Sequence, residues 1–156
     1  MIEFAKATAL IGVLGTAVVF GTDVFCAMVQ RPALALVDDG ALVAVMGHVH
    51  RYGDRRMPLP GVIGIVAAAA SAALAAAAGR WAMATMAATA LALLLVWLVL
   101  YLRVSAPINR QLTAAARAHD IPANARMLQA NWDRVINARA VLQGLAVCAL
   151  CTALIA

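Results

Sequence analysis

The chain of 156 residues is 65% hydrophobic and only 12% charged, which excludes an ordinary water-soluble domain. Its net charge of +5 would suit a nucleic-acid ligand, but the arginines lie at the ends of apolar runs rather than on one continuous surface, so we predict no nucleic-acid partner. The composition instead predicts an integral membrane protein.

Four apolar runs, each about long enough to cross a bilayer, occupy residues 4–29, 61–78, 81–102 and 138–156. Apolar and polar residues do not alternate within these runs, which excludes the strands of a membrane barrel and predicts helices. The first run is too long for the apolar part of a signal peptide and carries Asp23 near its end, so we expect it to remain as a span.

Short links and small residues predict how the spans pack. Only two residues join the second and third spans, which forces an antiparallel hairpin. Alanine dominates the second span, and Thr8, Gly12 and Thr16 place small residues on one stripe of the first, which favours close approach of helix backbones. We predict a single membrane domain over residues 1–156 with an all-α fold: an antiparallel bundle of four transmembrane helices with short amphipathic cytoplasmic helices.

Residues 30–60 form the first long connecting segment. Within it, four apolar residues recur at the spacing of one helical face, namely Leu42, Val45, Met46 and Val49. This pattern predicts an amphipathic helix, which we expect Pro58 and Pro60 to stop before the second span.

Residues 103–137 form the second long connecting segment. Ser105 and Pro107 predict the cap and first turn of a short amphipathic helix, and residues 119–122 predict its end. No proline follows Pro122, so we expect the helix of the fourth span to extend several turns beyond the membrane.

The basic residues predict an orientation. Nine of the twelve lie in the two long segments, a tenth, Arg139, lies at the start of the fourth span beside them, and only Lys6 and Arg80 lie on the opposite side. The positive-inside rule then predicts a protein of the cytoplasmic membrane with both long segments in the cytoplasm and both termini outside. Membrane lipids are the expected partners of the arginines there.

Asp23 is an ionisable residue inside a predicted span. Such a group costs roughly a few kcal/mol unless it is paired, and it is a functional candidate by default. Arg139 lies at a matching depth at the start of the fourth span, so we predict an ion pair between Asp23 and Arg139. The pair would either belong to a site or only hold two helices in register.

The segment from Gly47 to Arg56 contains His48, His50 and Asp54, and three interpretations of it stay open. It can be an interfacial helix, a site for iron, copper or haem with His48 and His50 as ligands, or an acid–base site. On a helix the two histidines point about 200° apart, whereas His50 and Asp54 share a face. The sequence leaves the identity of the cofactor open: it is iron, copper, haem or none.

Asn109, Asn131 and Trp132 lie near the predicted cytoplasmic mouth of the bundle. Trp132 shares a helical face with Arg139 and Gln143. The two asparagines could hydrogen-bond a ligand or each other, and Trp132 could contact a substrate or anchor its helix at the interface. We assign Asn109, Asn131 and Trp132 as candidate substrate-binding residues.

Several short elements carry a resemblance over the whole chain. A glycine-containing first span ends before a proline, Pro107-x-Asn109 follows the third span, and Trp132 precedes Arg139 by seven positions at the entry to the fourth span. This pattern resembles the anthrone-oxygenase-like family of integral membrane proteins, most of which are known only as a domain of unknown function. The resemblance implies oxidation of anthrones to anthraquinones by molecular oxygen, without a well-defined cofactor.

The leading hypothesis is a small integral-membrane oxidoreductase that acts on a hydrophobic aromatic or lipid-soluble small molecule at the cytoplasmic mouth of the bundle. Its candidate catalytic residues are Asp23, His50, Asp54 and Arg139. In this hypothesis His50 is a base or metal ligand that Asp54 orients, and Arg139 stabilises enolate or phenolate charge. Two alternatives are a haem- or metal-binding protein without turnover, and a non-enzymatic membrane partner or small exporter that acts as a homo-oligomer.

Overall fold

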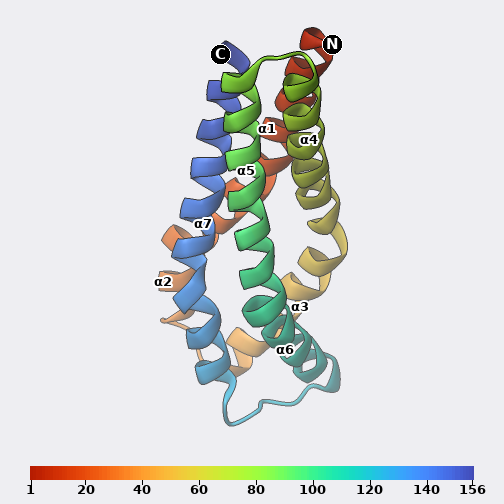
Figure 1. Ribbon diagram of the computed structural model, residues 1–156. Coiled ribbons are helices and arrows are strands. Elements are labelled where there is room, and N and C mark those ends of the chain that lie inside the picture. The colour runs from red at the N-terminus through yellow and green to blue at the C-terminus, as the bar shows by residue number, and fades with distance from the viewer.

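The computed structural model describes all 156 residues and consists of four long helical rods in an antiparallel bundle (Figure 1). Each rod, 31 to 39 residues long, is long and apolar enough to cross a membrane, for which about 20 residues suffice. The rods are built, in chain order, from α1 (Ile2–Phe25), η1 (Cys26–Gln30) and α2 (Arg31–Leu34); α3 (Asp39–Arg56) and α4 (Pro58–Ala77); α5 (Trp81–Leu100), η2 (Tyr101–Ser105) and α6 (Ala106–Ala118); and α7 (Ala125–Ile155). The predicted all-α four-helix class is confirmed.

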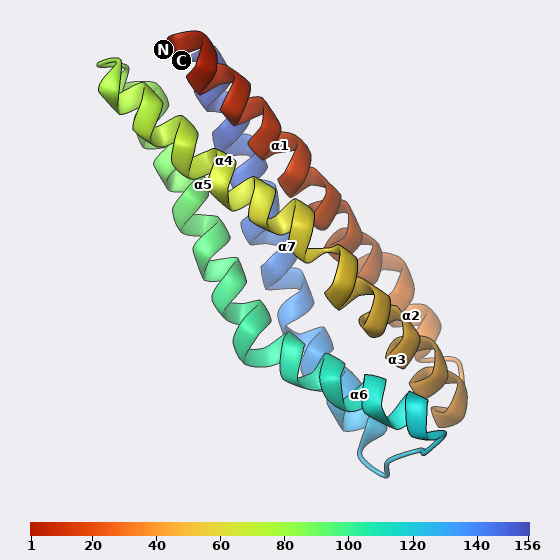
Figure 2. The same ribbon diagram turned by 90° about the vertical axis from the view of Figure 1, so that its right-hand side faces the viewer.

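The bundle has two distinct ends. Both chain termini and the α4–α5 turn lie at one end, which we call the terminal end (Figures 1 and 2). The connection from α2 to α3 and the loop between α6 and α7 lie at the other, which we call the arginine-rich end. Around the bundle, α1 packs against α4 and α7, and α5 packs against the same two helices, while α3 packs against α6 at the arginine-rich end.

The expected short helices between the spans are present, but they continue the spans instead of standing apart from them. The helix around residues 42–49 extends over the whole of α3, and only Met57 separates it from α4. Pro58 and Pro60 end α3 as expected, yet they also occupy the first turn of α4. A proline there interrupts no helical hydrogen bond, because the first N–H groups of a helix have no partner within it.

Two prolines inside the rods widen the helix without stopping it. Pro32 follows the π-helix η1 by two residues, and Pro107 follows the π-helix η2 at the same spacing. Proline lacks an N–H group and its ring crowds the carbonyl four residues earlier, so the hydrogen bonds just before it shift to the wider π pattern. The expectation that Ser105 caps a new helix is therefore wrong: Ser105 is itself helical, and its side chain makes no capping bond.

The predicted break after α6 is confirmed. The helix ends at Ala118, and His119 adopts the left-handed conformation with φ of 53°. The next helix begins at Ala125 and runs for 31 residues, which confirms that the fourth span extends well beyond its apolar part.

Small residues allow the rods to approach closely in the terminal half of the bundle. A Cβ atom on Gly15 would lie 2.8 Å from the carbonyl oxygen of Pro60, and one on Gly64 would lie 2.7 Å from the hydroxyl of Thr16. Closer to the terminal end, the core between the rods is made mainly of alanine, including Ala5, Ala9, Ala75, Ala84 and Ala153. Close backbone packing supplies the dispersion contacts that hold membrane helices together.

The closest approach between α3 and α6 predicts the effect of one substitution. A Cβ on Gly47 would contact the Cβ of Ala116 and lie 2.6 Å from the backbone oxygen of Leu112. We expect Gly47→Ala to push the helices apart and to lower the free energy of unfolding by about 1–3 kcal/mol. Thermal unfolding of the detergent-purified protein measures the loss.

Gly53→Ala is the matched control on the same helix, because a Cβ there would meet no atom within 4 Å. Alanine has the better helix propensity, so this variant should be as stable as the wild type or more stable by up to about 1 kcal/mol. Equal stability of the two variants would contradict the close contact at Gly47.

Candidate functional site

A cavity of about 170 Å³ lies between the rods, where their apolar parts give way to the arginine-rich end. Residues from α1, η1, α3, α4, α5, η2, α6 and α7 line it, so every rod contributes. Its size is comparable to that of an engineered apolar cavity of about 150 Å³ that binds benzene. The exposed residues Val49, Pro58 and Val62 also line it, so the cavity reaches the surface along the α3–α4 junction.

The predicted ion pair between Asp23 and Arg139 is confirmed and forms one wall of the cavity. Nη2 of Arg139 donates to Oδ1 of Asp23 at 2.8 Å, and both side chains are more than nine-tenths buried. Gln143 donates to Oδ2 of Asp23 at 2.6 Å, and the indole N–H of Trp97 reaches the same oxygen at 3.4 Å. These donors replace the hydrogen bonds to water that the carboxylate loses on burial.

Arg139 is held on its other sides as well. Its Nη1 donates to the hydroxyl of Ser105 at 2.8 Å, which explains why Ser105 is not a helix cap. Its guanidinium carbon lies 5.7 Å from the ring centre of Tyr101 and 5.5 Å from that of Trp132. Contact with two aromatic faces adds cation–π attraction and leaves the guanidinium little freedom to move.

His50 faces the cavity beside Trp132. Only 4% of His50 is exposed, and its ring lies 5.5 Å from that of Trp132, centre to centre. The residue lies beyond the apolar part of its rod, and burial there lowers the pKa of its imidazole to about 4; Asp54 acts in the raising direction and Arg139 in the lowering direction. His50 is therefore neutral at pH 7, and its Nε2 atom has no hydrogen-bond partner in the protein.

The two histidines do not form the metal site considered above. His48 is exposed and His50 is buried, since they lie on different faces of the helix α3. Nowhere in the chain do three His, Cys, Asp or Glu side chains come close enough to hold a metal ion. The residues around His50 therefore do not fit a metal centre, and a cavity of about 170 Å³ accommodates a single ring better than a haem macrocycle.

Asp54 does not orient His50, contrary to expectation. Its Oδ1 atom instead accepts hydrogen bonds from the hydroxyl of Tyr101 at 2.9 Å and from Nδ2 of Asn109 at 2.7 Å. This arrangement fixes Tyr101 and Asn109 at the cavity wall and joins α3 to η2 and α6. Asp54 is thus a positioning residue for two neighbours.

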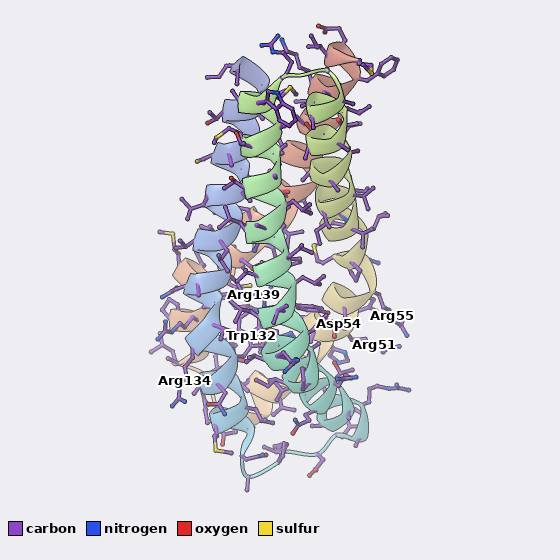
Figure 3. The ribbon with its side chains drawn as sticks, viewed as in Figure 1. Arg51, Asp54, Arg55, Trp132, Arg134 and Arg139 are labelled. Carbon is purple, nitrogen blue, oxygen red and sulfur yellow. The ribbon has the colours of Figure 1, made fainter.

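The three candidate substrate-binding residues are only partly brought together. Asn109 and Trp132 line the cavity, but Asn131 does not, because the adjacent position on α7 points about 100° away. Asn131 is half-buried and does not form a hydrogen bond with Asn109, whose side chain donates to Asp54 instead. Figure 3 shows Trp132 and Arg139 one above the other along α7, with Asp54 on the other side of the bundle.

Four buried polar atoms around the cavity have no hydrogen-bond partner in the protein. They are Nε2 of His50, Nε1 of Trp132, Oδ1 of Asn109 and Nε of Arg139. Buried polar groups almost always have partners, and leaving one unpaired costs about 1–3 kcal/mol. A mostly apolar cavity with two unpaired N–H donors, an amide acceptor and a neutral imidazole suits a small, flat ligand that carries oxygen atoms.

Sequence reasoning missed two aromatic residues of the site, Trp97 and Tyr101. Both lie in the third apolar run, one helical turn apart, and their rings stack at 6.1 Å. Their polar tips were the available signal, because a buried indole N–H or phenol usually needs a partner. Here those partners are Asp23 and Asp54.

Comparison of the chain with protein families, curated proteins and solved structures finds no match.

The buried ion pair predicts a characteristic pattern of stability changes. Arg139→Met leaves Asp23 buried without its cation, so we expect the free energy of unfolding to fall by about 3–5 kcal/mol. The double variant Asp23→Leu/Arg139→Met removes both charges and should recover most of that loss. Unfolding of the purified variants in detergent measures both changes.

Arg134→Met is the control, since Arg134 is an exposed arginine on the same helix. It should change stability by no more than about 0.5 kcal/mol. A double variant that is less stable than Arg139→Met would argue against a buried charge as the cause.

Proposed function

We propose that the protein is a small integral-membrane oxidoreductase that binds a planar, lipid-soluble aromatic compound in the cavity and oxidises it with molecular oxygen. The observation that carries the proposal is the pairing of a buried, neutral His50 with the unpartnered N–H of Trp132 at the wall of one apolar cavity. A proton acceptor and a hydrogen-bond donor that share a mostly apolar cavity can remove a proton from a ligand and stabilise the charge that develops.

Exposed apolar residues surround the opening of the cavity, which is consistent with a ligand that enters from the lipid. Val49 is 43% exposed and Val62 is 56% exposed, and both line the cavity where it meets the surface. Leu59, between them in sequence, is 68% exposed. A lipid-soluble molecule can enter through this apolar margin. Its first ring would occupy the cavity, and further rings would extend toward the opening.

The proposed reaction converts a ring CH₂ group next to an aromatic ketone system into a second ketone. His50 accepts a proton from the CH₂ carbon, and the electron pair left behind delocalises onto the ketone oxygen, where the N–H groups of Trp132 and Arg139 stabilise it. Oxygen adds to the carbanion, the proton returns, and the resulting hydroperoxide loses water. One O₂ is consumed, the carbon is oxidised, and one oxygen atom leaves as H₂O.

Arg139 has a more limited role than the sequence hypothesis gave it. Its positive charge is matched by Asp23 at 2.8 Å, and both of its Nη atoms are engaged. It contributes one further donor, Nε, to the cavity. The developing oxyanion would therefore receive hydrogen bonds from the site without an uncompensated positive charge.

One observation favours a second candidate function, a binding protein without turnover. Catalytic histidines are commonly oriented by a third group, as in hydrolase triads. Asp54, the residue predicted for that role, makes no hydrogen bond with His50, and its Oδ1 atom accepts hydrogen bonds from Tyr101 and Asn109 instead. A carrier for the same aromatic ligand would need only the cavity and its donors.

The arginine distribution supports a defined orientation in the cytoplasmic membrane. We propose that the arginine-rich end is cytoplasmic and that both termini are outside, because ten of twelve basic residues flank the apolar rods at that end. Fusions at each terminus to alkaline phosphatase, which is active only outside, should both be active, whereas a fusion placed in residues 119–124 should be inactive. The reverse pattern would exclude this orientation.

Turnover of anthrone by the purified protein tests the proposed reaction. We expect the wild type to consume anthrone and O₂ in equal amounts and His50→Gln to be at least ~100-fold slower, since general bases contribute about 10²–10⁴-fold. Trp132→Phe keeps the ring but removes the N–H donor, so it should also slow turnover. Absorbance of the quinone product and an oxygen electrode measure both quantities.

The control is His48→Gln, an exposed histidine two positions away that should keep wild-type turnover. Binding of anthrone without oxidation would replace the enzyme with the carrier alternative. Full activity of His50→Gln would remove His50 from the chemistry.

A further inference from the structure

A second, polar groove lies beside the cavity, between α3 and α6. Arg51 and Arg55 line it from α3, and Arg110 and Arg117 line it from α6, together with Thr113. Figure 3 shows Arg51 and Arg55 next to Asp54 on one side of the molecule, with Arg134 on the other side. We call this feature the arginine groove.

The backbone brings these arginines together. Gly47 lets α3 lie directly against Leu112 and Ala116 of α6, and the hydroxyl of Thr113 donates to the carbonyl oxygen of Gly47 at 3.1 Å. Arg51 and Arg55 then follow one and two turns after Gly47, while the two α6 arginines lie on either side of Thr113 in sequence. Two packed helices therefore present four guanidinium groups to one groove.

The four arginines have no anionic partner within the protein. The only ion pairs in the structure are Arg126–Asp39 and Arg139–Asp23, neither of which is in the groove. Nε of Arg51 is buried and has no hydrogen-bond partner. Four like charges held on two packed helices repel one another, so the arrangement favours a bound anion that would relieve the repulsion.

Asp54 is the one carboxylate in the groove, and its position makes it part of the wall. Tyr101 and Asn109 hold its Oδ1 atom from the cavity side. Four guanidinium groups against one carboxylate leave the groove strongly positive. Asp54 also lines the cavity, so the two sites share this residue.

We propose that the arginine groove binds a phosphate group, from either an anionic phospholipid headgroup or a water-soluble phosphate compound. Guanidinium groups bind phosphate oxygens in pairs of parallel hydrogen bonds, which makes arginine well suited to this ligand. Arg55 lies three residues before Pro58, where the apolar part of its rod begins, so the groove starts at the depth of lipid headgroups. Phosphate binding in the groove does not require the oxidation proposed for the cavity, although Asp54 lines both sites.

Binding of two probes to the full-length purified protein tests the proposal. Isothermal titration in an uncharged detergent measures the affinity for inorganic pyrophosphate. Native mass spectrometry counts molecules of phosphatidic acid that stay bound, with phosphatidylcholine, a zwitterionic lipid of zero net charge, as the comparison. Arg55→Gln/Arg110→Gln removes two exposed arginines of the groove, and Arg31→Gln/Arg134→Gln removes two exposed arginines elsewhere, so both variants lose the same charge.

We expect the groove variant to bind its probe at least ~10-fold more weakly, while the control variant binds as the wild type does. Loss of pyrophosphate binding in the groove variant alone would support a soluble phosphate ligand. Selective loss of phosphatidic acid, with no pyrophosphate bound by the wild type, would support a lipid headgroup. Equal weakening in the two variants, or no binding of either probe by the wild type, would overturn the proposal.

Discussion

The ion pair between Asp23 and Arg139 is the constraint on which the rest of the site depends. It joins α1 to α7, and the bond from Arg139 to Ser105 adds η2 to the same junction. A buried charge is tolerated only when its partners are complete, so the sliding of any of these rods along its axis would leave one of them unpaired. The relative heights of these three rods are thereby fixed, and Trp132, which packs against Arg139, lies beside His50 of α3.

Much of the fold could be predicted from the sequence because membranes impose simple rules. Length and apolarity locate the four spans, and the two-residue link makes the second and third spans antiparallel. The partner of Asp23 was predictable for the same reason: a charged residue in a span needs a partner, and depth counted from the span ends selects Arg139. Within the candidate site, the sequence identified His50, Asn109 and Trp132 as residues that turn out to line the cavity.

The remaining features depend on rotations and contacts that periodicity does not encode. A shift of one residue turns a side chain by about 100°, which separates Asn131 from the cavity that its neighbour Trp132 lines. Prolines are usually read as helix ends, but tertiary packing can instead absorb them as π segments, as it does before Pro32 and Pro107. Asp54 becomes the acceptor for Tyr101 and Asn109 only when two rods, α3–α4 and α5–η2–α6, pack together in the fold.

The alanine-rich packing of the terminal half has a consequence for how molecules can move through the protein. In that half the rods touch through Ala5, Ala9, Ala75 and Ala153, all fully buried, and the described cavity lies entirely on the arginine-rich side. Closely packed helices therefore separate a ligand held in the cavity from the terminal end of a single bundle. The shortest way out of the cavity is the margin formed by Val49, Pro58 and Val62, on the side where the cavity meets the surface.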